Sequence, residues 1–180
     1  MKAIFFSDTG SPDVLQFGEM CDPKPGPDQA LIRVRAVSVN PIDTYIRNGA
    51  NYWPLPRPFI PGCDFAGEIV ELGSNAAQSV LHSGVAATGK LSIGQRVWGS
   101  NQGLLGRQGT FAEYAVVDLP WIYPLPDDVT FESAAASALV GITAHLGLFH
   151  EGDIQPGQKI FVRGGAGGVG SMVLHMAKIA

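Results

Sequence analysis

Six residues near the end of the chain have the spacing of a turn that binds phosphate groups. They form a G-x-G-x-x-G motif and are Gly165, Ala166, Gly167, Gly168, Val169 and Gly170. The apolar run before them, 159–162, is predicted to be a strand, and a helix is predicted from Val169 onward. Glycines at these positions permit a tight bend, close approach of a pyrophosphate to the backbone, and packing of helix on strand.

The motif therefore predicts a dinucleotide site, in which free amides at the helix start hold the phosphates without a lysine. The simpler alternative is a glycine-rich turn that binds nothing, but the predicted strand and helix on either side favour the cofactor. The residue that selects NAD or NADP lies about 20 residues beyond such a motif, and the fold around it needs about six strands. Neither is contained in this chain, so we expect an incomplete nucleotide-binding domain.

Thiols and imidazoles, the usual ligands of transition metals, are few and poorly spaced. Cys21 and Cys63 form neither a disulfide framework nor a paired-cysteine zinc site. The histidines have no ligand-pair spacing; they are His82, His145, His150 and His175. We therefore expect no metal, and we expect Cys63 to be a small buried hydrophobic residue.

The elements that must position these residues are predicted first from hydrophobic patterning. Short apolar runs broken by turn-forming residues extend to about Val117 and predict an irregular β-barrel or sandwich. The expected strands are 3–6, 14–17, 30–39, 65–71, 95–99 and 110–117. In 30–39, side chains alternate with the period of two that is typical of a half-buried strand.

Asn40 and Pro41 are the residue types of an N-cap and a first helical position, so 41–48 is predicted to be one or two helical turns. The proline-rich segment after it is predicted to be a stiff loop that walls a cleft, with Tyr52 and Trp53 as weaker candidates for that wall. The small and polar segment 74–92 is predicted to be a surface insertion without chemistry.

After Pro124 the sequence becomes rich in alanine and leucine with helical spacing, and Asp127 or Thr130 is a suitable cap. We therefore expect two domains. Residues 1–125 would form the β domain, and 126–180 would form the beginning of a dinucleotide-binding domain.

Composition excludes several classes of protein. The formal net charge is −4, which offers no basic face to a nucleic-acid backbone. The N-terminal apolar run is too short for a signal peptide, and we expect no membrane-spanning window later in the chain. A soluble protein of the reducing cytoplasm fits these properties best.

Seven segments together resemble the medium-chain dehydrogenase/reductase superfamily, and most closely its zeta-crystallin-like quinone oxidoreductase branch. They are SPDVLQFGEM, VNPIDTYIRNG, PFIPGCDFAGEIVELGSN, GQRVWG, GTFAEYAVV, FESAAASALVGITAHLGLF and KIFVRGGAGGVG. The resemblance covers nearly the whole chain. It implies a mixed fold: an N-terminal GroES-like irregular β-barrel that carries the substrate pocket, followed by the start of a Rossmann α/β domain, with the cofactor in the cleft between them.

The resemblance also implies roles for individual residues. Asn40 and Tyr45 match residues that line the pocket, which makes both candidates for catalysis and Asn40 a candidate for cofactor binding as well. Thr143 matches a hydroxyl placed against the nicotinamide side of the cofactor. Simpler roles remain open: capping for Asn40, core packing for Tyr45, and a hydrogen bond to its own helix for Thr143. Asp43 is expected to be a salt-bridge or turn residue.

Zinc alcohol dehydrogenases of the superfamily place a cysteine where this chain has Asn40, a histidine where it has Cys63, and a further cysteine near Val140. Because a catalytic zinc needs three protein ligands, the resemblance implies a zinc-free branch. Without a Lewis acid, the substrate should already be electron-poor, such as a quinone or an α,β-unsaturated carbonyl that accepts hydride from the nicotinamide.

The expected function is thus an NAD(P)H-dependent quinone or enone reductase. NADPH is the expected cofactor and NADH the alternative, and the full-length protein is expected to be a homodimer without nucleic-acid or membrane partners. Two rival functions remain open at this point. One is an enoyl-thioester reductase of the same superfamily, and the other is an inert nucleotide-binding structural protein.

Overall fold

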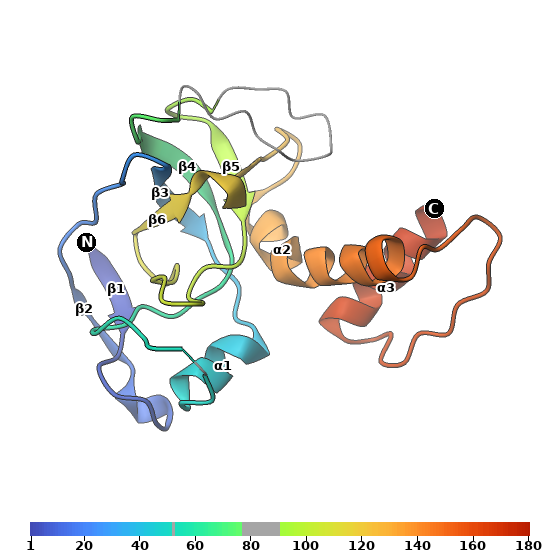
Figure 1. Cartoon of the computed structure of the whole chain (residues 1–180), viewed down its shortest axis with the longest axis horizontal. Helices are drawn as coiled ribbons and strands as arrows, with labels where there is room; N and C mark the ends of the chain where they lie inside the picture. The colour runs from blue at the N-terminus through green and yellow to red at the C-terminus, as the bar shows by residue number, and fades with distance from the viewer. Residues whose placement is uncertain (52, 77–90) are drawn as a thin grey trace. The chain divides into compact units, whose positions relative to one another are not determined.

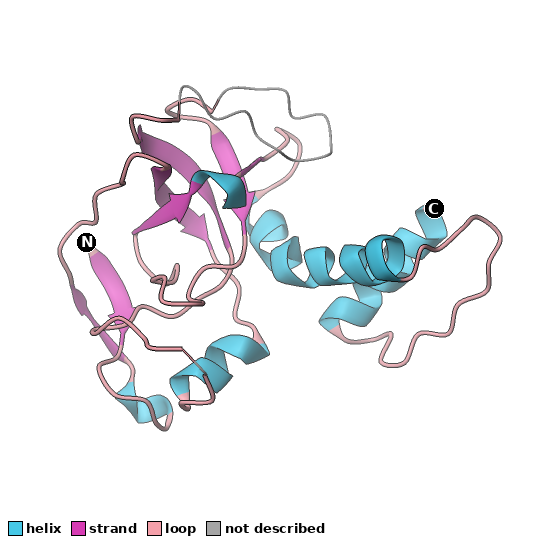
Figure 2. Cartoon of the chain, viewed as in Figure 1, coloured by secondary structure: helices cyan, strands magenta, loops and turns pink. Residues whose placement is uncertain are grey.

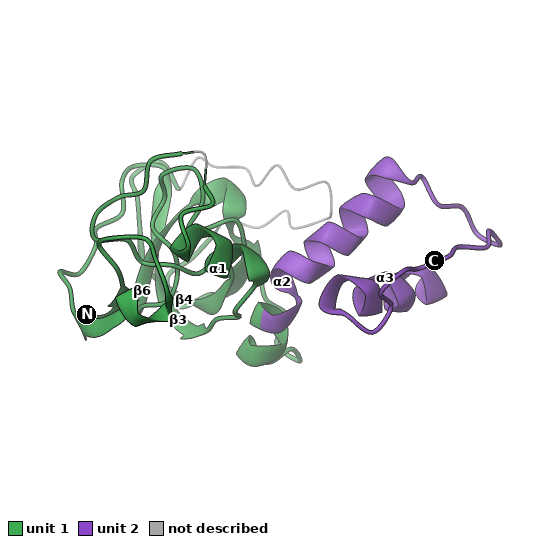
Figure 3. Ribbon diagram, turned by 90° about the horizontal axis from the view of Figure 1, so that it is seen from below, with its two compact units in different colours: residues 1–135 green, residues 136–180 purple. Residues whose placement is uncertain are grey.

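The computed structural model describes residues 1–51, 53–76 and 91–180. The chain divides into two compact units, Met1–Ala135 and Ala136–Ala180, which are coloured separately in Figure 3. The division falls inside a helix, ten residues beyond the domain boundary expected at 125/126. That domain boundary stays a prediction.

A five-stranded antiparallel sheet is the centre of the first unit, with strand order β6-β3-β4-β5-β7 (Figure 1). The strands are β3 (Gln29–Ala36), β4 (Phe65–Leu72), β5 (Arg96–Gly99), β6 (Tyr114–Asp118) and β7 (Tyr123–Pro124). In β3, Ala30 and Ile32 are buried, whereas Arg33 and Arg35 are exposed. This alternation confirms the period of two expected for the strand.

One cluster of buried apolar side chains packs on this sheet. Its members are Ala30, Ile32, Phe65, Ile69, Ala76, Leu91, Val97, Ala115, Val117, Leu119 and Ile122. Full burial of a large apolar side chain contributes about 1.5–3 kcal/mol, so this cluster is the main stabilising feature of the unit.

A smaller sheet pairs β1 (Lys2–Phe5) with β2 (Gln16–Glu19), and the 3-10 helix η1 (Pro12–Val14) lies between them in the chain. The Ile4 amide donates to the Phe111 carbonyl oxygen at 2.8 Å, so β1 is tied to the loop before β6. Three expected strands differ from the structure. The strand expected at 30–39 ends at Ala36, and residues 37–40 are outside any strand. The strand expected at 14–17 begins at Gln16, and the strand expected at 110–117 begins at Tyr114, because the amides of Thr110 and Phe111 donate instead to the turn at Pro61 and Gly62.

The predicted short helix is confirmed as α1 (Pro41–Arg47), with Asn40 at its N-cap. The helix ends where Gly49 adopts a φ of 89°, a left-handed conformation that glycine takes without strain. Its buried residue Ile46 packs with Phe6 and Phe59, and Trp53 packs against the same group. Trp53, in the proline-rich loop, therefore packs against the C-terminal end of α1.

After the 3-10 helix η2 (Leu119–Trp121), the chain enters α2 (Phe131–His145), which continues as the π-helix η3 (Leu146–Glu151). Of the two expected caps, the structure uses Thr130, whose Oγ1 accepts from the Ser133 amide at 3.2 Å. Helical residues 131–151 contain an 18-residue window with a mean hydropathy of 1.2, so this helix is long and apolar enough to cross a membrane by length and composition alone. The expectation that no window reaches this length was wrong, although core helices of soluble proteins pass the same test.

The second unit ends in α3 (Gly168–Ile179), which confirms the helix expected after the glycine motif. The strand expected at 159–162 was wrong, since none of the described residues of this unit is in a strand (Figure 2). A strand needs a neighbour that accepts its hydrogen bonds, and the described part of this unit offers none. Phe161 is accordingly 93% exposed. The expected insertion 74–92 lies largely outside the described residues, as does Tyr52.

Candidate functional site

Segments far apart in the chain bring six polar side chains together in the first unit. We call this group the polar cluster; its members are Ser38, Asn40, Asp43, Cys63, Asp64 and Thr110. They come from the segment after β3, the start of α1, the residues before β4, and the loop before β6. The sheet and the α1 cap therefore determine the geometry of the cluster.

Asn40 is 6% exposed and is held at both its backbone and its side chain. Its backbone amide donates to Asp43 Oδ2 at 2.7 Å, in a capping-box arrangement at the start of α1. Its side-chain Nδ2 donates to Asp64 Oδ2 at 2.9 Å and lies 3.2 Å from Ser38 Oγ. The capping role is thus present, together with a side-chain network that the sequence did not predict.

Asp64 is the centre of this network, and it is 1% exposed. Besides the bond from Asn40, its Oδ2 accepts from Ser38 Oγ at 2.6 Å. Thr110 Oγ1 donates to the Asp64 backbone carbonyl at 2.7 Å, which anchors the same residue from the loop before β6. Hydrogen bonds to an ionised acceptor are among the stronger ones, so this arrangement holds the Asp64 side chain firmly.

Asp43 and Cys63 are both buried, and each affects the ionisation of the other. Burial raises the pKa of the Asp43 carboxyl above its ordinary value of 3.8, while hydrogen bonds from the Asn40 amide and the Cys63 thiol oppose that change. Burial, followed by the nearby Asp43 carboxylate, raises the pKa of the Cys63 thiol far above its ordinary value. Cys63 is therefore a neutral thiol at physiological pH, as expected for a buried hydrophobic residue.

Two carboxylate oxygens of the cluster, Asp43 Oδ1 and Asp64 Oδ1, are buried without a hydrogen-bond partner in the described part of the chain. Within residues 1–51, 53–76 and 91–180, no group of three or more His, Cys, Asp or Glu side chains is arranged to hold a metal ion. The two orphaned oxygens make the cluster costly to bury, which is more typical of functional sites than of cores.

Tyr45 lies in α1 and is 54% exposed. The Tyr45 side chain is therefore not part of the core that the described residues form. Its side chain is thus more exposed to a ligand than that of Asn40. Trp53, a weaker candidate for the pocket wall, is partly buried against Phe6, Ile46 and Phe59.

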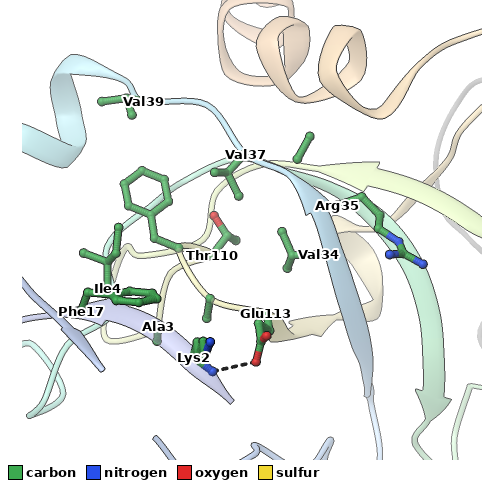
Figure 4. A pocket seen from close by; sticks show the side chains of 13 residues that line it. Lys2, Ala3, Ile4, Phe17, Val34, Arg35, Val37, Val39, Thr110 and Glu113 are labelled. Atoms are coloured by element: carbon green, nitrogen blue, oxygen red, sulfur yellow. Dashed lines mark hydrogen bonds between the residues drawn. The ribbon is translucent and has the colours of Figure 1, made fainter. Parts of the chain in front are cut away.

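An open apolar pocket of about 500 Å³ lies on the other side of the segment that follows β3 (Figure 4). Figure 4 shows Ile4, Phe17, Val34 and Val37 around it, with the Lys2 amide bonded to Glu113 at one edge. Side chains of the segment alternate: Val37 and Val39 line the pocket, whereas Ser38 and Asn40 belong to the polar cluster. The pocket offers mainly apolar contact, and Thr110 is the one member of the polar cluster that also lines it.

The glycine motif forms a turn that leads into α3. Gly164, just before the motif, adopts a φ of 79°, and its carbonyl accepts from the Gly167 amide at 2.9 Å. Gly167 is the N-cap of α3 and has extended backbone angles. The first amides of a helix have no partner inside it, so they are free to meet an anion.

Folding requires glycine at some positions of the motif and not at others. A Cβ on Gly170 would lie 2.1 Å from the Gly164 carbonyl oxygen, so close packing of helix on turn demands glycine there. A Cβ on Gly167 would meet only that same oxygen at an ordinary 3.4 Å. Since neither contacts nor backbone angles require glycine at 167, its bare backbone fits a pyrophosphate that approaches from outside.

The remaining motif residues are consistent with an accessible turn. Ala166, Gly168 and Val169 are exposed, and a Cβ on Gly165 would be 3.1 Å from Leu174 Cδ1. Thr143 is exposed on α2, and its Oγ1 donates to the Leu139 carbonyl at 2.8 Å. The alternative expected for Thr143, a bond to its own helix, is therefore present, and its hydroxyl retains lone pairs for a ligand.

Sequence reasoning missed Asp64, Ser38 and Thr110, and it undervalued Asp43, which forms no ion pair in the described structure. One signal was available. Continuing the period of two beyond residue 36 places Ser38 and Asn40 on the same face, and both are polar. The partner of that face, Asp64, lies just before β4 and has no local sequence signal.

Known proteins resemble this chain in both sequence and structure. The model of the alcohol dehydrogenase GroES-like domain matches residues 26–127. The quinone oxidoreductase of Pongo abelii is 33% identical over 179 residues, and the 2-methylene-furan-3-one reductase of Solanum lycopersicum is 36% identical over 184 residues; each alignment covers 99% of this chain, and 50% and 44% of the relative, respectively.

Among solved structures, the NADPH complex of Escherichia coli quinone oxidoreductase is 30% identical, with a TM-score of 0.81. That match covers 99% of this chain and 50% of the other. The chain thus spans about half the length of the relatives it matches. The expected resemblance to quinone oxidoreductases is confirmed, as is the mixed fold with an N-terminal GroES-like domain.

Proposed function

We propose, from the premise that this chain belongs to the alcohol dehydrogenase GroES-like domain family, that it forms the first half of an NADPH-dependent reductase of quinones or other α,β-unsaturated carbonyls. The observation that carries the proposal is the bare backbone of Gly167 at the start of α3, where folding itself does not require glycine. Relatives named as a quinone oxidoreductase and a furanone reductase, and a neighbour solved with NADPH, support the same chemistry.

The glycine turn would hold the dinucleotide phosphates. Backbone amides at the start of α3 donate to the pyrophosphate, and the positive end of the helix dipole adds to that attraction. Gly170 keeps the turn pressed on the helix, so these amides are positioned before the ligand arrives. When bound, the nicotinamide supplies the hydride; the residues of this chain bind and orient.

A catalytic zinc, which alcohol dehydrogenases of the family carry, does not fit the polar cluster. A catalytic zinc needs three protein ligands, and the described residues offer no group of three or more His, Cys, Asp or Glu side chains that could hold it. The Asn40 amide nitrogen is a donor engaged with Asp64, not a ligand. We therefore propose a zinc-independent reaction, which restricts the substrate to carbonyl compounds that are already electron-poor.

Tyr45 is proposed to act on that substrate. Its exposed phenol can donate a hydrogen bond to the carbonyl oxygen that gains charge as hydride arrives. Asn40 is proposed to bind the ligand through the part of its amide that the chain leaves available. Thr143 stays a predicted contact of the cofactor, and NADH stays the alternative to NADPH.

The experiment is a comparison of Gly167→Ala with Gly147→Ala in the natural full-length protein. A Cβ at 147 meets nothing within 4 Å, so both substitutions leave the fold intact, but only the first intrudes on the phosphate. We expect Gly167→Ala to weaken NADPH binding at least about tenfold, or 1.4 kcal/mol. Gly147→Ala should bind like the wild type, as measured by titration of nicotinamide fluorescence.

Turnover then identifies the substrate class. The wild type should oxidise NADPH in the presence of a simple quinone, followed by absorbance at the nicotinamide band. Activity on an enoyl thioester but not on quinones would show the first rival function. Protection against thermal unfolding by NADPH without any turnover would show the inert nucleotide-binding protein.

A further inference from the structure

The Asn40 side chain is held in one orientation, and this orientation decides which kind of ligand group it can bind. We infer that Asp64 is a positioning residue that turns the amide nitrogen of Asn40 inward, so that Asn40 offers a ligand its oxygen and recognises a hydroxyl, not a carbonyl. The inference rests on the proposed function, because it concerns the same site and its ligands.

The donor and acceptor inventory supports this orientation. A carboxylate only accepts hydrogen bonds, and Asp64 Oδ2 already takes the single hydroxyl proton of Ser38 at 2.6 Å. The atom of Asn40 that lies 2.9 Å from the same oxygen must therefore be a donor, which is Nδ2. A flipped amide would place its oxygen against Asp64 Oδ2, with two acceptors in contact and no proton between them.

The backbone of Asn40 cannot relieve such a flip by moving. Its amide is bonded to Asp43 Oδ2 at 2.7 Å, and Pro41 follows it at the first position of α1. Thr110 anchors Asp64 from the opposite side through the 2.7 Å bond to its backbone carbonyl. Donor and acceptor are thus both held in place.

The oxygen of Asn40 is the end that remains for a ligand. An amide oxygen carries two lone pairs, and the capping box at α1 uses at most one of them. It can accept from a hydroxyl, whereas a quinone carbonyl, which is also an acceptor, would be repelled. Two ligands of the proposed reaction carry hydroxyls: the riboses of the dinucleotide and a hydroquinone product.

The test measures dissociation constants of the full-length protein for NADPH, a simple hydroquinone and the matching quinone. The key variant is Asp64→Asn, since an amide at 64 can donate as well as accept and so permits Asn40 to flip. The matched control is Asp118→Asn, which changes a carboxylate that accepts an amide proton from Gln29 at 2.7 Å in β6, outside the polar cluster.

We expect Asp64→Asn to weaken binding of NADPH, of the hydroquinone, or of both, by about tenfold. The ligand whose dissociation constant rises, NADPH or the hydroquinone, carries the hydroxyl that Asn40 binds. Quinone affinity should stay within twofold, and Asp118→Asn should change no constant by more than twofold. If Asp64 acts through Asn40, the double variant with Asn40→Ala should bind no more weakly than Asn40→Ala alone.

Three results would overturn the inference. They are loss of quinone affinity with hydroxyl ligands unaffected, an Asp64→Asn effect that persists in the Asn40→Ala background, and no change in any constant. If Asp64→Asn does not fold, Ser38→Ala serves instead: Asn40 Nδ2 is then the one donor left to Asp64 Oδ2 among the described side chains, so the amide keeps its orientation. Binding of the same hydroxyl ligand should then stay within about twofold of the wild type, and its loss would count against the inference. A wild type that neither binds nor oxidises NADPH refutes the proposed function, while the hydroquinone and quinone arms still decide this inference.

Discussion

Asp43 stabilises the fold with one carboxylate oxygen and destabilises it with the other. Its Oδ2 caps α1, but its Oδ1 is buried without a partner among the described residues, next to the Cys63 thiol and the Asp64 carboxylate. Burial raises the pKa of Asp43, and the charge of Asp64 adds to that effect. Asp43 therefore binds its proton more tightly in the folded chain than in the unfolded chain.

This predicts a specific dependence of stability on pH. Because the folded-state pKa of Asp43 is raised, the stability it contributes is fully present below its ordinary value of 3.8 and is lost as pH rises through the folded-state pKa. Asp43→Asn keeps an oxygen that accepts from the Asn40 amide but removes the charge. Its free energy of unfolding should fall less than that of the wild type between about pH 4 and pH 8, measured by urea denaturation.

The control for this experiment is Asp128→Asn, which removes a carboxylate that is exposed. It should leave the pH dependence as in the wild type. Cys63 does not interfere, because its raised pKa keeps the thiol protonated in the folded state throughout this range. Parallel curves for Asp43→Asn and the wild type would contradict the prediction.

At the residue scale, the sequence predicted what depends on local pattern. The glycine motif, the cap at Asn40 and the burial of Cys63 all follow from residue types and spacing over a few positions. The bond between Asn40 and Asp64 joins residues 24 positions apart, and its existence depends on sheet pairing. No short-range pattern encodes such a contact.

At the scale of elements, Arg96 of β5 joins the sheet to the turn that begins α2. Its guanidinium donates to the carbonyls of Pro126, Asp127 and Val129, and it lies 4.7 Å from the centre of the Phe131 ring. These carbonyls lie in the turn that precedes α2, and one side chain satisfies all three. The start of α2 is thus fixed by a residue of the sheet.

Replacing Arg96 by alanine should destabilise the protein by about 2–3 kcal/mol, because three carbonyls lose a charged donor. Arg33→Ala is the matched comparison: Arg33 also lies near an aromatic ring, 5.9 Å from the centre of Tyr114, but it is exposed. That change should cost no more than about 0.5 kcal/mol. Chemical denaturation measures both, and equal losses would refute the role given to Arg96.

Elements with a strong internal pattern were predictable, and those that depend on a distant partner were not. The alternation in β3 and the cap of α1 identified both elements from sequence. The two-residue strand β7 exists only because β5 pairs with it, and it was missed. The opposite error occurred at 159–162, where an apolar run without a neighbouring strand stays outside any sheet.

At the scale of the whole molecule, the absence of a fitting zinc site in the polar cluster predicts how the protein responds to additives. EDTA should change neither the melting temperature nor the NADPH-dependent turnover of the full-length protein. NADPH at 100 times its dissociation constant should instead stabilise it by about 2.7 kcal/mol. Thermal melts and absorbance assays measure both, and activity lost to EDTA and restored by zinc would contradict a metal-free reaction.

The alternation from Val37 to Asn40 has a consequence for how this protein can change over evolution. Successive side chains of that stretch serve two environments, an apolar hollow and a hydrogen-bonded interior. Individual substitutions disturb one environment at a time, but insertion or deletion of a single residue exchanges them, and valine would then displace an amide from its carboxylate. An insertion or deletion in this stretch should therefore be less well tolerated than a substitution of any single residue in it.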